Sequence, residues 1–186
     1  MQTAALKCYL CQTTHNLMEY DEEDGICQPC YQEQLTTMEG YKRARTNKFP
    51  EIDLIEEGIY LGNEDAATSL DILKERNITA ICACGAHLDT PFLEDKDFSY
   101  KIFHIQDFPK QQILNYFPDH HAWMVQMRQQ HKNILVHCAA GVSRSASFVI
   151  AYIMKEKQMP FHKAYELVKS KRKWANPNSG FRQQLK

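Results

Sequence analysis

The sequence predicts an α/β fold, with a twisted, mostly parallel central sheet flanked by helices and a small separate module at the N-terminus. From residue 52 onward, short apolar runs alternate with longer segments that carry helix signals, and strands that alternate with helices favour a parallel sheet. Four of the seven cysteines, in contrast, lie within the first 30 residues, which indicates a different kind of folding unit there. We expect a module over residues 1–40, a linker over 41–50 and a larger domain over 51–186.

The elements of the larger domain are expected from apolar runs and helix-end signals. Strands are expected at 59–61, 78–82, 100–105 and 133–137, and helices at 63–75, 118–130, from after 141 to 157, and at 160–172. Asn63 can cap its helix because an asparagine side chain accepts hydrogen bonds from the free N–H groups of a first turn. Pro118 suits a helix start, since proline is favoured in the first turn.

Length and composition limit the classes of protein to consider. The 186 residues are 44% hydrophobic and 24% charged, with a formal net charge of −1, which gives no overall attraction to nucleic acid or to a membrane. The longest apolar run, 148–154, is too short to span a bilayer. The first residues lack the basic and apolar regions of a signal peptide. We therefore expect a protein of the cytoplasm, or also of the nucleus. In either compartment its thiols stay reduced.

The segment from His137 to Ser145 carries the main chemical signal of the chain. It reads HCAAGVSRS, in which an apolar strand ends at His137 and a short loop separates Cys138 from Arg144. The residues expected to bind substrate through this loop are Ala139, Ala140, Gly141, Val142, Ser143 and Arg144. A loop of small residues before a helix can aim its N–H groups inward at an anion, and the helix N-terminus adds a positive field. The segment therefore predicts a phosphate-binding site.

The positive field at the helix N-terminus also favours Cys138 as a nucleophile. Thiols at helix N-termini ionise readily, so Cys138 is expected to be a thiolate near neutral pH. Arg144 can bind two phosphate oxygens with its planar guanidinium. The Ser145 hydroxyl can stabilise the sulfur as it leaves, and His137 can hold the loop through hydrogen bonds. The alternative is a structural cysteine beside an incidental arginine.

The motif H-C-x5-R-S after an apolar strand resembles the protein tyrosine phosphatase superfamily, and the string HCAAGVSRSAS resembles its dual-specificity branch. Residues 59–62 and 176–185 resemble the opening strand and the closing segment of these domains. The resemblance implies a dual-specificity protein phosphatase domain over 51–186 that hydrolyses phosphotyrosine and phosphoserine or phosphothreonine through a phosphocysteine, with no cofactor for catalysis. In such domains Asn178 helps to fix loops near the active site, although capping of a turn is an equally open role.

The departing oxygen needs a proton that the thiolate loop cannot supply, so a separate general acid is expected. The upstream candidates are Asp89, Asp95, Asp97, Asp107 and Asp119. Asp107 follows the strand at 100–105 and precedes Cys138 by the separation that the family shows. It is therefore the expected general acid, and the same carboxylate would then activate water.

The substrate class is inferred from what the domain lacks. It is too short for the extra elements that build a deep tyrosine-specific pocket, and no Lys or Arg lies between Cys138 and Arg144, which makes a phosphoinositide less favoured. RNA 5′-phosphate and glycan substrates stay open, as does a phosphoprotein-binding scaffold without turnover. The basic run 169–173 can attract acidic substrates, but a solvated helix end that complements the helix dipole is the simpler interpretation.

Cys8, Cys11, Cys27 and Cys30 have the C-x2-C…C-x2-C spacing of a structural zinc site. Two such pairs complete a tetrahedral site, and the metal would supply much of the folding energy of this small unit. His15 can replace one ligand, and a redox or disulfide role is the alternative. Residues 1–30 carry one Lys against five acidic residues, so we expect a protein partner for this module and no nucleic acid.

Two cysteines lie near the end of a predicted strand. Cys82 and Cys84 share one face of that strand, since side chains alternate with a period of two. Some relatives form a disulfide between a cysteine in this region and the nucleophile, which makes Cys84 the candidate partner of Cys138. A buried, inert thiol is the simpler interpretation.

Overall fold

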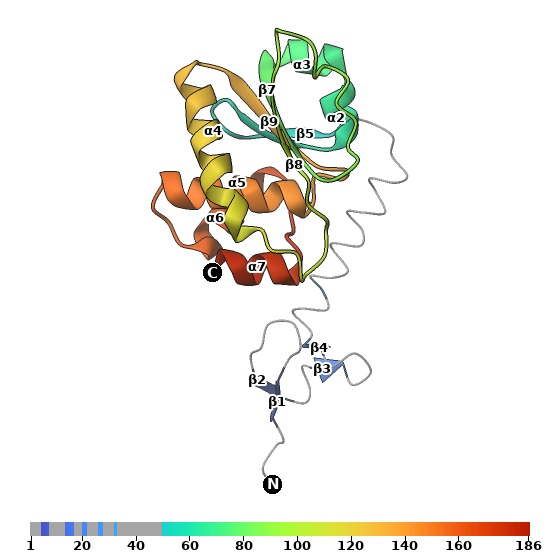
Figure 1. The fold of residues 1–186 in the computed structure, drawn as a ribbon. Coiled ribbons are helices and arrows are strands. Elements are labelled where there is room, and N and C mark those ends of the chain that lie inside the picture. Colours follow the sequence, from blue (N-terminus) through green and yellow to red (C-terminus); the bar gives the residue numbers. More distant parts are fainter. Residues whose placement is uncertain (1–4, 8–13, 17–19, 22–25, 28–31, 33–49) are drawn as a thin grey trace.

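The computed structural model describes residues 5–7, 14–16, 20–21, 26–27, 32 and 50–186 (Figure 1). In the N-terminal part, β1 (Ala5–Lys7) pairs with β2 (Thr14–Asn16) and β3 (Tyr20–Asp21) pairs with β4 (Ile26–Cys27), both antiparallel. The predicted zinc ligands Cys8, Cys11 and Cys30 and nearly all of the linker lie outside the described residues. Cys27 and His15 are described in their backbone alone, so the zinc site stays a prediction.

A five-stranded sheet forms the centre of residues 50–186. Its strands are β5 (Ile52–Glu56), β6 (Ile59–Gly62), β7 (Ile78–Cys84), β8 (Ser99–Phe103) and β9 (Asn133–His137), in the order β5-β6-β9-β7-β8. The pairs β6–β9, β9–β7 and β7–β8 are parallel, whereas β5 joins the edge as an antiparallel hairpin partner of β6. The predicted mostly parallel sheet is therefore confirmed.

Helices cover both faces of this sheet (Figure 1). The helices are α2 (Glu64–Thr68), α3 (Leu70–Glu75), α4 (Phe117–Gln129) preceded by a 3₁₀ turn η2 (Leu114–Tyr116), α5 (Arg144–Glu156), α6 (Phe161–Lys171) and α7 (Ser179–Leu185). One apolar cluster joins α4, α5, α6 and α7 to one face, and a smaller cluster joins α2 and α3 to the other. No helix within the described ranges is both long and apolar enough to cross a membrane.

The alternation of side chains along the strands explains why the sheet is buried on both faces. In β9, Ile134 and Val136 point into the larger apolar cluster, whereas Leu135 between them points into the smaller one. All three side chains are fully buried. A run of consecutive apolar residues is what a parallel strand between two helical layers requires, and β9 has the bounds that the sequence predicts.

One predicted helix is divided in two. Asn63 caps α2, since its side chain accepts a hydrogen bond from the Ala66 N–H at 3.0 Å. The helix does not continue to Glu75 as expected, because Ser69 has an extended backbone (φ −94°, ψ 103°) and α3 begins after it. The short helix α7 is a further element that the sequence did not predict.

Candidate active site

The predicted site residues gather at the carboxyl ends of the parallel strands, where ligands bind in open α/β sheets. β9 ends at His137, and the loop that follows leads into α5 at Arg144. β8 ends at Phe103, and the segment after it carries Asp107. The parallel pairing of these strands with β7 therefore brings residues that are far apart in the sequence to one edge.

The loop from Ala139 to Val142 has its carbonyl groups bonded to donors on its outer side. The Ala139 and Val142 carbonyl oxygens accept from the backbone N–H groups of Glu64 (3.3 Å) and Asn176 (2.7 Å). The Ala140 and Gly141 carbonyl oxygens accept from Nη2 (3.1 Å) and Nε (2.8 Å) of Arg172. A trans peptide points its C=O and N–H in opposite directions. The N–H groups that follow these carbonyls therefore face the interior of the loop, as an anion site requires.

Gly141 allows the loop to make its turn. Its φ is +65°, in the left-handed region, and an added Cβ would lie 2.5 Å from the Gly62 carbonyl oxygen. Only glycine adopts this backbone without strain and fits against the backbone of β6. The shape of the loop thus depends on this residue.

Arg172 holds the outer side of the loop. Its side chain is 1% exposed, and besides the two loop carbonyls its guanidinium contacts Asp53 at 2.7 Å and Glu51 at 3.5 Å, both at the β5 edge of the sheet. The basic run 169–173 was expected to be solvated, and for Arg172 that expectation is wrong. These two partly exposed carboxylates compensate its charge, which is how a buried arginine is tolerated.

Cys138 lies at the base of the loop and is 2% exposed. The Ser145 hydroxyl, in the first turn of α5, donates a hydrogen bond to Cys138 Sγ at 3.2 Å. A hydroxyl donor at this distance can hydrogen-bond a sulfur that loses or regains negative charge during a reaction. The arrangement therefore suits both a thiolate nucleophile and a thiolate leaving group.

Asp107 is held directly beside this loop. Its Oδ1 accepts hydrogen bonds from Ser143 Oγ at 2.7 Å and from Asn178 Nδ2 at 2.8 Å, and its Oδ2 lies 3.9 Å from Arg144 Nε. Of the other candidates, Asp119 pairs with Lys101 on the surface at 2.6 Å. Asp89, Asp95 and Asp97 are exposed. Asp107 is the candidate carboxylate whose contacts reach the loop after Cys138.

Arg144 is the first residue of α5, directly after the loop. Its side chain is 14% exposed, and its Nη1 lies against Gly85 at the end of β7, 2.4 Å from where a Cβ would be. Its guanidinium thus lies close both to the end of β7 and to Asp107. A planar guanidinium in this position can bind two oxygens of one phosphate group.

Asn178 performs both of the roles that the sequence left open. Its side-chain oxygen caps α7 by accepting from the Phe181 N–H at 3.0 Å. Its Nδ2 bonds Asp107, and its backbone N–H donates to Ser143 Oγ at 3.0 Å. Ser143 therefore contributes through its hydroxyl as well as through its backbone, which the sequence did not indicate.

His137 differs from expectation. The side chain is fully buried, and neither ring nitrogen meets hydrogen-bond geometry with a group in the described part of the chain. Burial and the positive charge of Arg144 lower the pKa of His137 to about 4, with only partial compensation from the adjacent Cys138 backbone. The expected hydrogen bonds from His137 to the loop are not present, and the ring is neutral at physiological pH.

Cys82 and Cys84 share one face of β7, with their sulfur atoms 3.8 Å apart. Burial raises the pKa of the Cys84 thiol well above its usual value, and the neighbouring Cys82 and Cys138 raise it further. Cys84 is therefore a protonated, weak nucleophile, in line with a buried, inert thiol. Cys82, Cys84 and Cys138 are free thiols, and a disulfide on oxidation stays a prediction.

Replacement of Arg172 by alanine tests its hold on the loop. Arg172→Ala leaves Ala140 O and Gly141 O without their donor, so we expect inorganic phosphate to bind about tenfold more weakly. The free energy of unfolding should fall by roughly 3 kcal/mol, toward the low end for a broken buried pair, because Asp53 is 40% exposed. Calorimetric titration and urea unfolding measure the two effects. Lys171→Ala, at an exposed neighbour, is the matched control, and equal effects in both variants would contradict this role.

The neutral state of His137 predicts a pH dependence of stability. Because its folded pKa of about 4 lies below the ordinary value of 6.5, the unfolded chain binds the proton first as the pH falls. The contribution is fully present above pH 6.5 and is lost between 6.5 and 4, up to about 3 kcal/mol. Urea unfolding of wild type and His137→Asn across this range should give a steeper decline for wild type. Parallel declines would show that His137 does not titrate in this window.

Comparisons with known proteins place this geometry in a family. Residues 59–186 match the family described as dual specificity phosphatase, catalytic domain. Dual specificity protein phosphatase MPK-4 of Drosophila melanogaster is 41% identical over 73% of this chain and 35% of its own length. Dual specificity protein phosphatase 1B of Arabidopsis thaliana is 38% identical over 70% of this chain and 77% of its own length. The chain thus spans about a third of the fly relative and most of the plant relative.

The fold agrees with this match. The crystal structure of the human tyrosine phosphatase-like serine/threonine/tyrosine-interacting protein superimposes with a TM-score of 0.68 at 34% identity, over 72% of this chain and 92% of that one. DUSP15 superimposes with the same TM-score at 35% identity, over 72% of this chain and 84% of its own. The chain therefore belongs to the dual-specificity protein phosphatase family and carries the catalytic domain of that family.

Proposed function

We propose that this protein hydrolyses phosphotyrosine and phosphoserine or phosphothreonine in proteins through a phosphocysteine on Cys138. Cys138 Sγ attacks phosphorus, the S–P bond forms, and the bond to the alcohol or phenol oxygen breaks. The Asp107 carboxyl gives its proton to that leaving oxygen. Arg144 and the N–H groups of residues 140–143 bind the phosphate oxygens throughout.

The second half of the reaction uses the same groups in reverse. The Asp107 carboxylate takes a proton from a water molecule, the water oxygen attacks phosphorus, and the P–S bond breaks. The Ser145 hydroxyl, 3.2 Å from the sulfur, stabilises the thiolate that leaves, and inorganic phosphate is released. The observation that carries the proposal is the contact of Asp107 with Ser143 and Arg144 beside Cys138, which is the set that this chemistry needs.

The substrate class is the finer part of the proposal. Support comes from the names of the relatives in fly and plant, which are dual specificity protein phosphatases. The loop carries no basic residue between Cys138 and Arg144, which disfavours a phosphoinositide. Turnover of an RNA 5′-phosphate or a phosphorylated glycan would redirect the assignment to a non-protein substrate.

A second candidate function is capture of phosphoproteins without turnover. It is favoured by the similarity to the human phosphatase-like interacting protein. Cys138, Arg144 and Asp107 are all present in this chain, which favours the enzyme. Trapping with Asp107→Ala in a cell lysate would identify bound phosphoproteins under either function, so turnover is the discriminating measurement.

Hydrolysis of an aryl phosphate by the wild type, Cys138→Ser and Asp107→Asn tests the enzyme. Cys138→Ser should reduce turnover to background, because the hydroxyl is not ionised at neutral pH. Asp107→Asn should lower kcat on a phosphopeptide by roughly 10²–10⁴-fold, the usual contribution of a general acid, with little change in binding. Equal turnover by the wild type and Cys138→Ser would favour the scaffold, and near wild-type kcat of Asp107→Asn would remove the acid assignment.

We also propose that Cys8, Cys11, Cys27 and Cys30 hold a structural zinc ion in a module over residues 1–40 that binds a partner protein. The support is the ligand spacing in the sequence. Within the described residues, no group of three or more His, Cys, Asp or Glu side chains is arranged to hold a metal. Thiolate ligands and a thiolate nucleophile both need a reducing environment, which supports a cytoplasmic location, with the nucleus also open.

Metal analysis of the purified full chain tests the zinc proposal. We expect about one zinc ion per chain, lost in Cys8→Ser and Cys30→Ser but retained in Cys82→Ser. A fall in zinc content in all three variants alike, or no zinc in the wild type, would overturn it. Hydrolysis of an aryl phosphate should continue after zinc is removed, because catalysis needs no metal.

A further inference from the structure

The segment that carries Asp107 lies along the short helix α7 and contacts it at three successive positions. Asn178, at the start of α7, binds Asp107 itself. Gly180 packs against Pro109, and Gln184, one turn further, binds Gln111 and Ile113. We call residues 107–113 the acid segment. From residue 107 to residue 113 of this segment, the contacted residues on α7 run in the same order from 178 to 184. The two segments therefore lie side by side in matching order.

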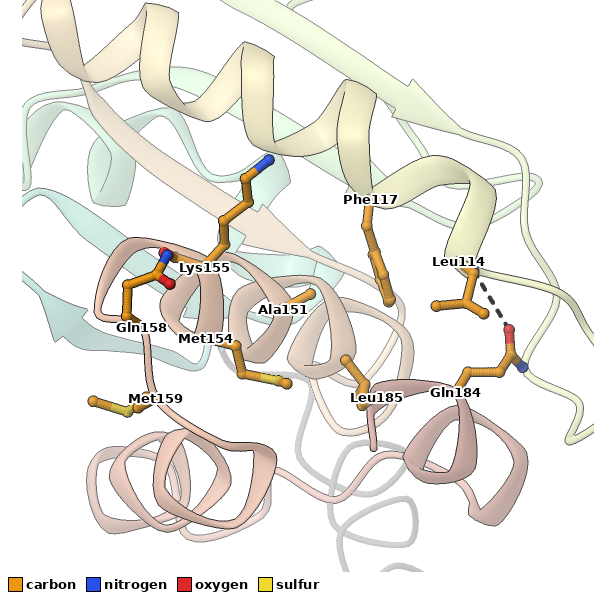
Figure 2. A pocket seen from close by; sticks show the side chains of 9 residues that line it. All are labelled: Leu114, Phe117, Ala151, Met154, Lys155, Gln158, Met159, Gln184 and Leu185. Atoms are coloured by element: carbon orange, nitrogen blue, oxygen red, sulfur yellow. Dashed lines mark hydrogen bonds between the residues drawn. The ribbon is translucent and has the colours of Figure 1, made fainter.

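Gln184 uses both ends of its amide on this segment. Its Oε1 accepts hydrogen bonds from the Ile113 N–H at 2.7 Å and the Leu114 N–H at 3.4 Å. Its Nε2 donates to the Gln111 carbonyl at 2.9 Å and to Gly180 within its own helix at 3.2 Å. Figure 2 shows the Gln184 side chain reaching from α7 toward Leu114, at the edge of a cavity of about 510 Å³ that both polar and apolar side chains line. That cavity lies away from Cys138, so the contact is separate from the phosphate loop.

Gly180 allows the close approach of the two segments. A Cβ at this position would lie 1.8 Å from the Pro109 carbonyl oxygen and 2.5 Å from its carbonyl carbon. These are backbone atoms that cannot move without moving the acid segment. Phe108 and Lys110, on either side of the Pro109 contact, have exposed side chains. Further along, the Ile113 side chain is fully buried in the larger apolar cluster, and its backbone N–H is the group that Gln184 accepts from.

We propose that Gln184 is a positioning residue for proton transfer, which sets the place of Asp107 by fixing the far end of the acid segment to α7. The proposal rests on Asp107 being the general acid of the proposed function. Gln184 bonds residues 111, 113, 114 and 180 rather than the phosphate loop, so its loss should leave phosphate binding and nucleophilic attack intact. The steps that suffer are the two that use Asp107, which are delivery of the proton to the departing oxygen and the later activation of water. The first of these depends on the leaving group.

Leaving-group dependence distinguishes this role from a general loss of structure. A nitrophenol leaves readily as its anion, whereas unsubstituted phenol needs a proton from the enzyme. The ratio kcat/KM reports only the steps up to formation of the phosphocysteine, before water is activated. We expect Gln184→Ala to lower kcat/KM on phenyl phosphate by about tenfold and on nitrophenyl phosphate by less than about twofold. The matched control is Gln183→Ala, the same substitution at the exposed neighbour on α7, which should match wild type on both substrates. A uniform loss on both substrates in Gln184→Ala would overturn the proposal.

Two further variants separate the hydrogen bonds from the stability of the helix. Gln184→Glu keeps an acceptor for the Ile113 N–H but loses the donor to Gln111, so its effect should be intermediate between wild type and Gln184→Ala. Gly180→Ala introduces a better helix former yet displaces Pro109, so it should show the leaving-group dependence of Gln184→Ala. Wild-type kinetics in Gly180→Ala would contradict the idea that contact with α7 places the acid segment.

A double mutant separates failure of this proposal from failure of the acid assignment. Once Asp107→Asn has removed the acid, Gln184→Ala should cause no further loss of kcat on phenyl phosphate. If Asp107→Asn alone has no effect on phenyl phosphate, the acid assignment fails. If Asp107→Asn lowers kcat and Gln184→Ala lowers it again by the same factor as in the wild type, Gln184 acts independently of Asp107 and the proposal is wrong.

Discussion

The shape of the phosphate loop depends on hydrogen bonds to four consecutive carbonyl groups, those of residues 139–142, on the outer side of the loop. Each carbonyl that is bonded on the outside directs the next N–H to the inside, because the trans peptide fixes the two groups in opposite directions. Arg172 supplies two of these bonds, and Asp53 of β5 holds its guanidinium in turn. The anion site is therefore supported from the edge of the sheet, by a buried charge on the side of the loop that faces away from the phosphate.

The hydroxyl of Ser143 connects this loop to the acid. It donates to Asp107 and accepts from the Asn178 N–H, so one side chain joins the loop before α5, the segment after β8 and the start of α7. The Asn178 side chain adds a second link between these segments, since it binds Asp107 and also caps α7. Since these three segments are distant in the sequence, the position of the carboxylate relative to Cys138 depends on the whole helical layer over this face of the sheet.

The sequence predicts those features that local patterns determine. The apolar run 133–137, the small-residue loop and the helix after it are local, and β9 and α5 form where they were expected. Arg172 lies in a basic run that is typical of a solvated helix end, and its burial follows from a pairing with Asp53, 119 residues earlier. Gln184 reaches Ile113 across 71 residues. The residues that flank each partner in the sequence give no sign of either contact, so only the structure could reveal them.

The two halves of the site are supported by different kinds of contact. The phosphate loop is held by buried bonds to Arg172 and Asn176, whereas the segment after Asp107 has exposed side chains at 108–110 and lies on the surface of α7. Buried backbone whose carbonyl groups are bonded is the more rigid of the two, since opening it leaves those carbonyl groups without partners. Binding of the phosphate and delivery of the proton thus depend on separate sets of contacts, and substitutions on α7 can alter the second while the first is preserved.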